Sequence, residues 1–204
     1  MSTESLFRIA FWALFGGSLT VQVYFARLVR RAGERVAADS KSIDREGRGC
    51  AVVRRLGTLA LVAFLVLYAI NPPWLGLLSV PLPDWLRWTG VVMGVISIAF
   101  HGWCEAALGK EWSPHLRTRE QHRLATTGPY ARIRHPIYVA LTGLLTGLAL
   151  VTANWLLIAR LAIHIVILAY RIPREEQMMT DEFGAEYESY MERTSRFFPR
   201  RRPT

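Results

Sequence analysis

Cysteine is scarce in this chain, with only Cys50 and Cys104 among 204 residues. Two thiols are too few for a cluster of metal ligands. One falls in a predicted loop and the other in a predicted membrane span, so the positions do not suggest a disulfide either. The sequence therefore predicts neither a disulfide framework nor a metal site.

The first apolar segment, residues 6–28, lacks the features of a secretory signal. It is longer than the apolar region of such signals, it contains Arg8 and Gln22, and no small-residue cleavage site follows it. We therefore expect this segment to be a membrane span.

Basic residues are absent from the connections 71–84 and 152–154. The connections 29–55 and 109–136 and the tail after residue 170 are instead rich in arginine. This alternation follows the positive-inside rule for five spans, with the N-terminus outside and the C-terminus in the cytoplasm. Because the basic residues alternate between the two sides, the net charge of +9 does not indicate nucleic-acid binding.

Apolar residues dominate what is present: 51% of the chain is hydrophobic, there are seven tryptophans, and the mean hydropathy is +0.20. This is too apolar for an ordinary soluble domain. The sequence predicts a single all-α domain over 1–204, a multi-span membrane helix bundle whose catalytic half is 101–204. About five transmembrane helices are expected, at 6–28, 56–70, 85–108, 137–151 and 155–170.

A basic loop meets an apolar segment at Gly128–Tyr138, which reads Gly-Pro-Tyr-Ala-Arg-Ile-Arg-His-Pro-Ile-Tyr. Pro129 fixes a turn after Gly128, and Pro136 favours an extended His135 and the first turn of a following helix. The junction is therefore predicted to hold basic side chains just outside a helix start.

Several polar residues fall inside the predicted spans. His101 and Glu105 are four apart and can hydrogen-bond on one helix face, either as a satisfied pair or as part of a site. Arg160, His164 and Arg171 also share a narrow face, which indicates a function by default. Arg160 lies close to the outer end, so we expect its side chain to snorkel to the interface.

The fourth and fifth spans are joined by only three residues, 152–154, and are expected to form a tight antiparallel hairpin. Gly143 and Gly147 are four apart in the fourth span. This spacing favours close helix packing.

After the last span, Pro173 is predicted to open a new helix with Glu175 and Glu176 in its first turn, where the helix dipole favours carboxylates. Tyr187 and Tyr190 continue an aromatic face that begins at residue 183, and we expect this interfacial helix to lie on the bilayer or on the loop above it. The closing segment 196–202 reads as an interfacial anchor.

The C-terminal half resembles the isoprenylcysteine carboxyl methyltransferase family, integral membrane enzymes that use S-adenosylmethionine. Five elements agree in order and spacing: Leu-Gly-Lys-Glu-Trp at 108–112, Thr-Gly-Pro-Tyr at 127–130, Arg-His-Pro-Ile-Tyr at 134–138, Arg-Ile-Pro-Arg-Glu-Glu at 171–176, and Phe-Gly-Ala-Glu-Tyr-Glu-Ser-Tyr at 183–190.

The resemblance implies a cofactor pocket for S-adenosylmethionine on the cytoplasmic side. Its cofactor-binding residues are expected to be Gly109, Trp112, Gly128, Pro129, Tyr130, Arg134, His135, Pro136, Tyr138, Glu176 and Tyr187. The catalytic residues are expected to be Arg171, which would hold the substrate carboxylate, and Glu175, which would hold Arg171 or polar groups of the substrate.

The implied acceptor is a lipid-like or prenylcysteine-like carboxylate that enters from the bilayer between spans. A carboxylate is ionised at neutral pH and needs no general base. The enzyme would then act by orienting the two reactants and excluding water, which can lower the barrier to methyl transfer by roughly 7–11 kcal/mol.

Three alternatives stay open. Phospholipid N-methyltransferases share a pair of glutamates, and an amine acceptor would need a base such as Glu175 or His101. Membrane sterol reductases bind NADPH and carry a similar His-Pro-x-Tyr element, but they usually have Asn where this chain has Ile137. A non-catalytic membrane scaffold is the third alternative.

Overall fold

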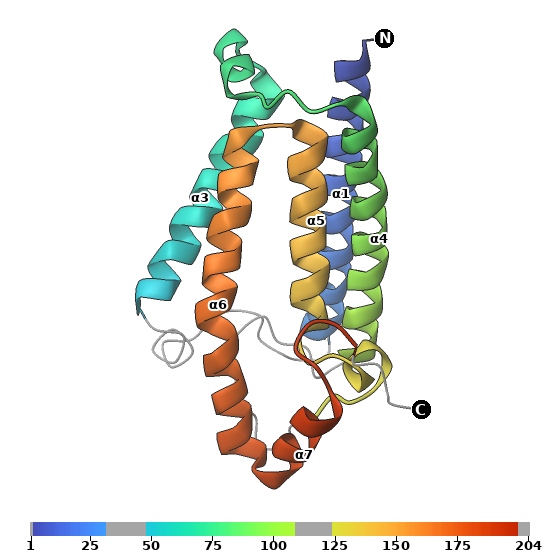
Figure 1. The fold of residues 1–204 in the computed structure, drawn as a ribbon, viewed down its shortest axis with the longest axis vertical. Helices are drawn as coiled ribbons and strands as arrows, with labels where there is room; N and C mark the ends of the chain where they lie inside the picture. Colours follow the sequence, from blue (N-terminus) through green and yellow to red (C-terminus); the bar gives the residue numbers. More distant parts are fainter. Residues whose placement is uncertain (1, 32–47, 109–123, 200–204) are drawn as a thin grey trace.

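The computed structural model describes residues 2–31, 48–108 and 124–199. These residues form long helices joined by short turns, with two isolated β-bridges and no extended strand (Figure 1). The helices are α1 (Thr3–Arg31), α3 (Arg48–Ile70), α4 (Asp84–Leu108), α5 (Pro136–Thr152), α6 (Trp155–Phe183) and α7 (Ala185–Arg193), with short 3₁₀ turns η1 (Pro73–Leu78) and η3 (Gly128–Ala131).

The predicted all-α multi-span bundle is confirmed. α1, α4 and α6 are 29, 25 and 29 residues long and are apolar enough to cross a membrane. Arg55–Ile70 and Pro136–Thr152 are shorter apolar helical stretches. With a rise of 1.5 Å per residue, the 17 residues of α5 span about 25 Å, somewhat less than a typical hydrocarbon core.

Helix α5 is the centre of the bundle: it packs against α4, α1 and α6, and α6 in turn packs against α3 (Figure 1). Glycines bring α4 and α5 into close contact. A Cβ atom on Gly147 would lie 2.7 Å from the carbonyl oxygen of Gly90, and one on Gly143 would lie 2.5 Å from Ser97 Oγ. The packing interpretation of Gly143 and Gly147 is therefore correct.

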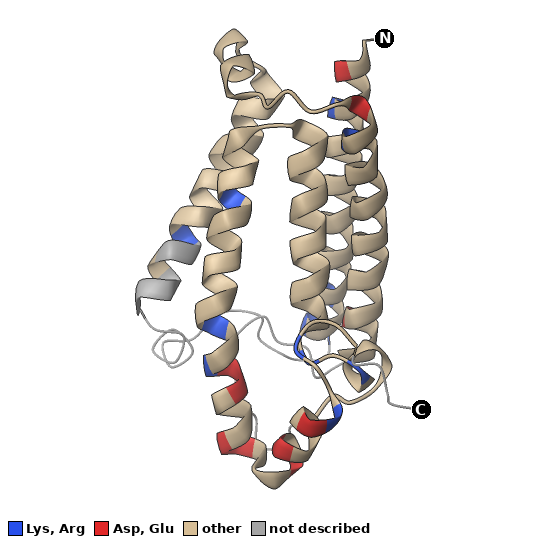
Figure 2. Ribbon diagram, viewed as in Figure 1, with Lys and Arg blue, Asp and Glu red and all other residues tan. Residues whose placement is uncertain are grey.

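A buried arginine near the start of α4 joins three helices. Figure 2 shows both acidic and basic positions at the end of the bundle that holds the N-terminus. Arg87 of α4 is 5% exposed, and its Nε and Nη2 donate hydrogen bonds to the Val151 carbonyl oxygen of α5 over 3.1 and 2.9 Å. The same guanidinium pairs with Glu4 of α1 and lies 3.8 Å from the centre of the Phe7 ring. The sequence analysis did not anticipate this cluster.

The prediction that Pro173 opens a new helix is wrong. α6 runs from Trp155 through Pro173 to Phe183, so Glu175 and Glu176 lie inside a continuous helix and not in a first turn. Proline costs an internal helix one backbone hydrogen bond. Both glutamates make side-chain bonds to other segments, and we infer that these contacts outweigh that loss. α6 ends at Phe183, before Gly184, which has a φ of +51°.

Candidate functional site

The site is built around the turn that leads into α5. Gly128 begins η3 with a φ of +57°, and a Cβ atom at this position would lie only 2.9 Å from the Cβ of Ala107 in α4. Glycine therefore fits both the conformation and the close contact. Pro136 is the first residue of α5 and His135 precedes it, so the predicted helix start at this junction is confirmed.

A buried carboxylate, Glu176, gathers three basic side chains. It accepts hydrogen bonds from Arg134 Nε at 2.9 Å and from Arg196 Nη2 at 2.6 Å, and its Oε1 lies 3.3 Å from His135 Nε2. The side chains of Arg134, His135 and Glu176 are 10%, 5% and 8% exposed. Glu176 thereby connects α6 to the turn before α5 and to the C-terminal segment.

The C-terminal segment also pairs with this turn through the backbone. Ile133 and Ser195 form a parallel β-bridge, in which Arg134 N donates to Ser195 O over 2.8 Å and Ser195 N donates to Arg132 O over 3.2 Å. Next to the bridge, His135 N donates to Arg196 O over 3.1 Å. Arg134 Nη1 adds hydrogen bonds to the carbonyl oxygens of Met191, at 3.1 Å, and Thr194, at 2.5 Å. The end of the chain is therefore part of the site.

A second polar group joins α5 to α6. Tyr138 Oη donates to Glu175 Oε2 over 2.6 Å and accepts from Arg171 Nε over 2.8 Å. Arg171 Nε and Glu175 Oε2 are 4.0 Å apart, and the two side chains are 14% and 29% exposed. The Tyr138 ring stacks on His135, with centroids 5.5 Å apart, so this group adjoins the Glu176 cluster.

Buried tyrosines of α7 pack against the turn that leads into α5. Tyr190 Oη donates to the Tyr130 carbonyl oxygen over 2.7 Å, and the Tyr187 and Tyr190 rings are 5.8 Å apart. Burial raises the pKa of Tyr130 and Tyr187, and raises the pKa of Tyr190 to about 12, so these phenols stay protonated. The aromatic face was expected to lie either on the bilayer or on the loop. The hydrogen bond from Tyr190 to Tyr130 shows that it packs on the loop.

The structure thus brings together most of the residues predicted for the site. The catalytic candidates Arg171 and Glu175 lie on α6 and contact Tyr138 at the start of α5. Nine of the cofactor-binding candidates lie at or beside this start: Gly128, Pro129, Tyr130, Arg134, His135, Pro136, Tyr138, Glu176 and Tyr187. Gly109 and Trp112 lie outside the described residues. The individual roles stay predictions.

Sequence reasoning missed Arg196, which it assigned to an interfacial anchor. Hydrogen bonding to Glu176 raises the pKa of the Arg196 guanidinium, and the neighbouring Phe197 ring lies 6.4 Å from His135. Thr194 is 2% exposed and bonds the Tyr190 carbonyl oxygen. The sequence carries no signal for this contact, because nothing in the local pattern says which acid the arginine-rich tail meets.

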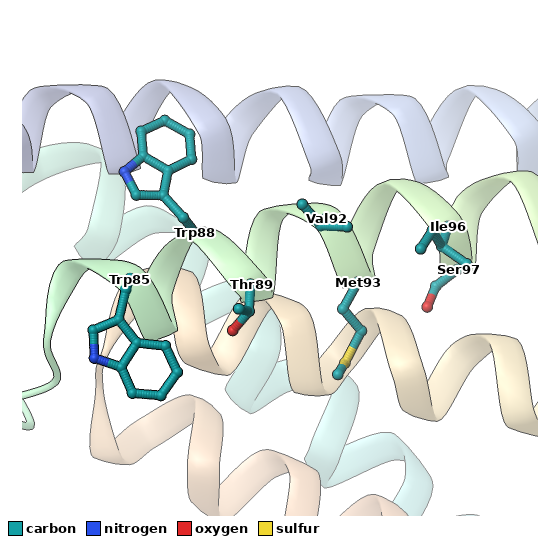
Figure 3. Close-up of a pocket in the computed structure, with 7 residues that line it drawn as sticks. All are labelled: Trp85, Trp88, Thr89, Val92, Met93, Ile96 and Ser97. Atoms are coloured by element: carbon teal, nitrogen blue, oxygen red, sulfur yellow. The ribbon is translucent and has the colours of Figure 1, made fainter.

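Helix α4 carries two further features, a buried polar pair and an apolar groove. His101 Nε2 and Glu105 Oε1 are 3.2 Å apart, so the predicted pair is formed, although His101 Nδ1 and Glu105 Oε2 are buried without a hydrogen bond. An apolar groove lies nearer the opposite end of α4, away from the polar site, and is lined by Trp85, Trp88, Thr89, Val92, Met93, Ile96 and Ser97 (Figure 3).

The arrangement has the donors and acceptors that S-adenosylmethionine needs. Arg134 Nη2 has no hydrogen-bond partner among the described residues, so it is suited to the carboxylate of the cofactor. Glu175 is the more exposed of the two glutamates and is suited to an ammonium or a ribose hydroxyl. The residues therefore fit this cofactor.

Residues 90–181, somewhat less than half of the chain, match the sequence model of the isoprenylcysteine carboxyl methyltransferase (ICMT) family. The fold is also similar to that of the eukaryotic intramembrane Ras methyltransferase ICMT. That comparison has a TM-score of 0.55 at 20% sequence identity and covers 93% of this chain and 67% of the other.

Curated relatives point in two directions by name. The nickel-cobalt-cadmium resistance protein NccN of Alcaligenes xylosoxydans xylosoxydans is 30% identical over 113 residues, and the cobalt-zinc-cadmium resistance protein CzcN of Cupriavidus metallidurans is 31% identical over 118. A probable protein-S-isoprenylcysteine O-methyltransferase of Oryza sativa subsp. indica is 28% identical over 119. These matches cover 55–56% of this chain and 53%, 54% and 61% of the respective relatives.

The chain thus matches only about half to three-fifths of the length of these relatives. Among the residues that the structure describes, no three His, Cys, Asp or Glu side chains are arranged to hold a metal ion. The motifs in the C-terminal half, the matching sequence model and the fold agree with one another. The resemblance to the isoprenylcysteine carboxyl methyltransferase family is thereby confirmed, with the matched region extending from residue 90 to residue 181.

Proposed function

We propose that this protein is an S-adenosylmethionine-dependent carboxyl O-methyltransferase that acts on a lipid-like or prenylcysteine-like carboxylate at the membrane. The observation that carries the proposal is the Arg171–Tyr138–Glu175 group. It lies where the apolar part of α6 ends, and it adjoins the Glu176 cluster through the stacked rings of Tyr138 and His135. Apolar helices beside a cationic group suit an amphiphile with one carboxylate.

In this mechanism Arg171 orients the acceptor carboxylate, and Tyr138 fixes the Arg171 side chain by accepting its Nε–H. Glu175 in turn orients the Tyr138 hydroxyl. Arg134 and Glu175 are the residues that would hold the cofactor, which supplies an electrophilic methyl group on a sulfonium. The carboxylate needs no base, so these residues act by binding and orientation.

Glu176 has a different role from the one that the family resemblance implies. Three basic side chains surround its carboxylate, which leaves it little capacity for a cofactor. We infer that Glu176 positions the turn before α5 and does not touch the cofactor. The site lies at the arginine-rich end of the bundle, which the positive-inside rule assigns to the cytoplasm.

The test is methyl transfer by the full chain in lipid nanodiscs, with a farnesylated cysteine derivative as acceptor. Replacing Arg171 by Ala should lower kcat at least a hundredfold, because an interaction with the reacting group is lost. Binding of S-adenosylhomocysteine, measured by calorimetry, should change by less than about threefold. Arg174→Ala is the matched control, since Arg174 lies on the exposed face of the same helix turn and should retain activity.

Three results would contradict the proposal in different ways. Loss of S-adenosylhomocysteine binding in Arg171→Ala would move Arg171 to the cofactor site. Binding of NADPH without S-adenosylhomocysteine would favour the reductase alternative. Methylation of phosphatidylethanolamine but not of the farnesylated cysteine would favour an amine acceptor.

A further inference from the structure

The C-terminal segment carries two aromatic side chains that the rest of the described chain does not cover. Phe197 is 38% exposed and has its ring 6.4 Å from the His135 ring, whereas Phe198 is 77% exposed. Exposure by itself says little, because single apolar side chains are common on protein surfaces. The depth of Phe198 relative to the membrane decides what its ring contacts.

Backbone hydrogen bonds fix the depth of this segment. Ile133 pairs with Ser195, and His135 N donates to Arg196 O over 3.1 Å. His135 directly precedes α5, so Arg196 lies level with the start of that helix, where Figure 1 shows the C-terminal segment in red. Consecutive Cα atoms are about 3.8 Å apart, so the backbone of Phe198 lies within about 8 Å of Arg196.

The start of α5 lies at the edge of the hydrocarbon core. The 17 residues of this apolar helix span about 25 Å, which is less than the roughly 30 Å of hydrocarbon in a typical bilayer. A central helix that is shorter than the hydrocarbon core cannot carry its ends far into water. Interfacial segments bury their apolar side chains about 5–10 Å into the boundary between headgroups and acyl chains. At this depth, an exposed aromatic ring contacts lipid.

We propose that Phe198 inserts into the adjacent surface of the bilayer and thereby holds the C-terminal segment against the turn before α5. The partner is the lipid surface itself, which offers acyl chains to the ring and headgroups to the neighbouring cations. The Arg196 side chain is 52% exposed, and Arg132 of the turn is also exposed. Cations at headgroup level suit a surface that contains anionic lipids.

This contact couples the membrane to the Glu176 cluster. The amides of Arg134 and His135 donate to the carbonyl oxygens of Ser195 and Arg196 over 2.8 and 3.1 Å, and the Arg196 side chain binds Glu176. Anchoring the end of the segment in lipid disfavours states in which it leaves the turn, so these bonds should open less often. The proposal concerns how the cluster is held together and does not depend on the reaction or the cofactor.

The first experiment locates the segment relative to lipid. A chain with Cys50→Ser and Pro199→Cys, labelled with the fluorophore NBD, is placed in nanodiscs of phosphatidylcholine and phosphatidylglycerol at one copy per disc. Cys104 is 0% exposed and should not react. Phosphatidylcholine with a nitroxide on its headgroup should quench the label, and adding Phe198→Ser should reduce the quenching.

A label at position 189 is the matched control. Ser189 is an exposed residue of α7, which lies beyond the end of the helix bundle (Figure 1). Its label should be quenched much less than the label at position 199. Equal quenching at the two positions would overturn the proposal. So would protection of the label at position 199 from iodide without quenching by the nitroxide lipid, because a protein partner would then cover the segment.

The second experiment measures the coupling by hydrogen exchange and mass spectrometry in the same nanodiscs. The amides of Arg134 and His135 should exchange about tenfold faster in Phe198→Ser than in the wild type, because the variant loses a buried phenyl ring. Phe198→Leu should keep the wild-type rate, because its side chain stays apolar. Tyr24→Ser removes a 58% exposed aromatic side chain from α1 and should leave these amides unchanged.

Unchanged exchange in Phe198→Ser would overturn the coupling, and so would equally fast exchange in Phe198→Leu or Tyr24→Ser. Exchange at the centre of α5 reports whether each variant is folded. Quenching of the label at position 199 is measured with Phe198 present, so misfolding of a Phe198 variant leaves that test intact.

Discussion

Replacing Glu176 by Ala should destabilise the protein by about 3–5 kcal/mol, the cost of removing one partner from a buried ion pair. The size follows from the burial of the partners. Arg134 and His135 are 10% and 5% exposed; without Glu176, Arg134 would lose its counter-charge and His135 its hydrogen-bond partner. Arg196 is 52% exposed, so water compensates it and its pair with Glu176 adds at most about 1 kcal/mol.

These values predict an order among variants. Glu176→Ala should be the most destabilising, Arg134→Ala should follow because it leaves Glu176 and two carbonyl groups with fewer donors, and Arg196→Ala should have the smallest effect. For a chain of this size, about 3–5 kcal/mol corresponds to a decrease in Tm on the order of 10 °C. Arg174→Ala, which alters an exposed arginine, should leave Tm unchanged.

The buried thiol of Cys104 provides the assay. Cys104 is 0% exposed, so a dye that becomes fluorescent on reacting with thiols reports unfolding of the helix bundle, in a Cys50→Ser background that removes the other cysteine. The reasoning would be refuted if Glu176→Ala kept the wild-type Tm but lost binding of S-adenosylhomocysteine. That result would return Glu176 to the cofactor site that the family resemblance implies.

The remaining predictions concern the packing of the helices and are measured in the same assay. Gly147→Ala should lower Tm by several degrees, because the new Cβ would lie 2.7 Å from the Gly90 carbonyl oxygen. Gly16→Ala is the control and should not lower Tm, because nothing lies within 4 Å of that position. Equal effects of the two variants would contradict the close packing of α4 and α5. Arg87→Gln should destabilise the protein by about 2–4 kcal/mol, because the Arg87 side chain is only 7% exposed and binds the Val151 carbonyl oxygen. Glu4→Gln should destabilise it by less than about 1 kcal/mol, because the Glu4 side chain is 68% exposed. A larger effect of Glu4→Gln would show that the ion pair, and not the contact with the Val151 carbonyl, holds the helices together.

The helices themselves could be predicted from the sequence because apolar length and prolines act locally. All five apolar segments are helical, and α5 begins at Pro136 as the fixed φ of proline favours. Local rules failed at Pro173, where they predicted a helix start. In the helical turn after Pro173, Tyr138 binds Glu175 and Arg196 binds Glu176. These partners lie 35 residues before and 23 residues after Pro173 in the sequence, beyond the reach of local rules.

The site was predictable in part for the same reason. The motifs located the junction at 128–138 and the acidic pair at 175–176, because both are continuous in the sequence. They did not reveal the parallel bridge between Ile133 and Ser195, which pairs two residues from distant parts of the chain. Nor did they reveal that Arg160 turns toward Gly57, since a glycine in an apolar helix gives no indication of which side chain occupies the space beside it.

The two adjacent glutamates show why a motif alone does not assign roles. Successive residues of an α-helix point about 100° apart, so Glu175 and Glu176 cannot serve one ligand in the same way. Glu175 faces Tyr138 and Arg171, and its side chain is 29% exposed. Glu176 faces Arg134 and Arg196 and is 8% exposed. In the proposed site, which would hold both a cofactor and an acceptor, Glu175 is the carboxylate that stays accessible, and Glu176 is the one that fixes the turn and the C-terminal segment.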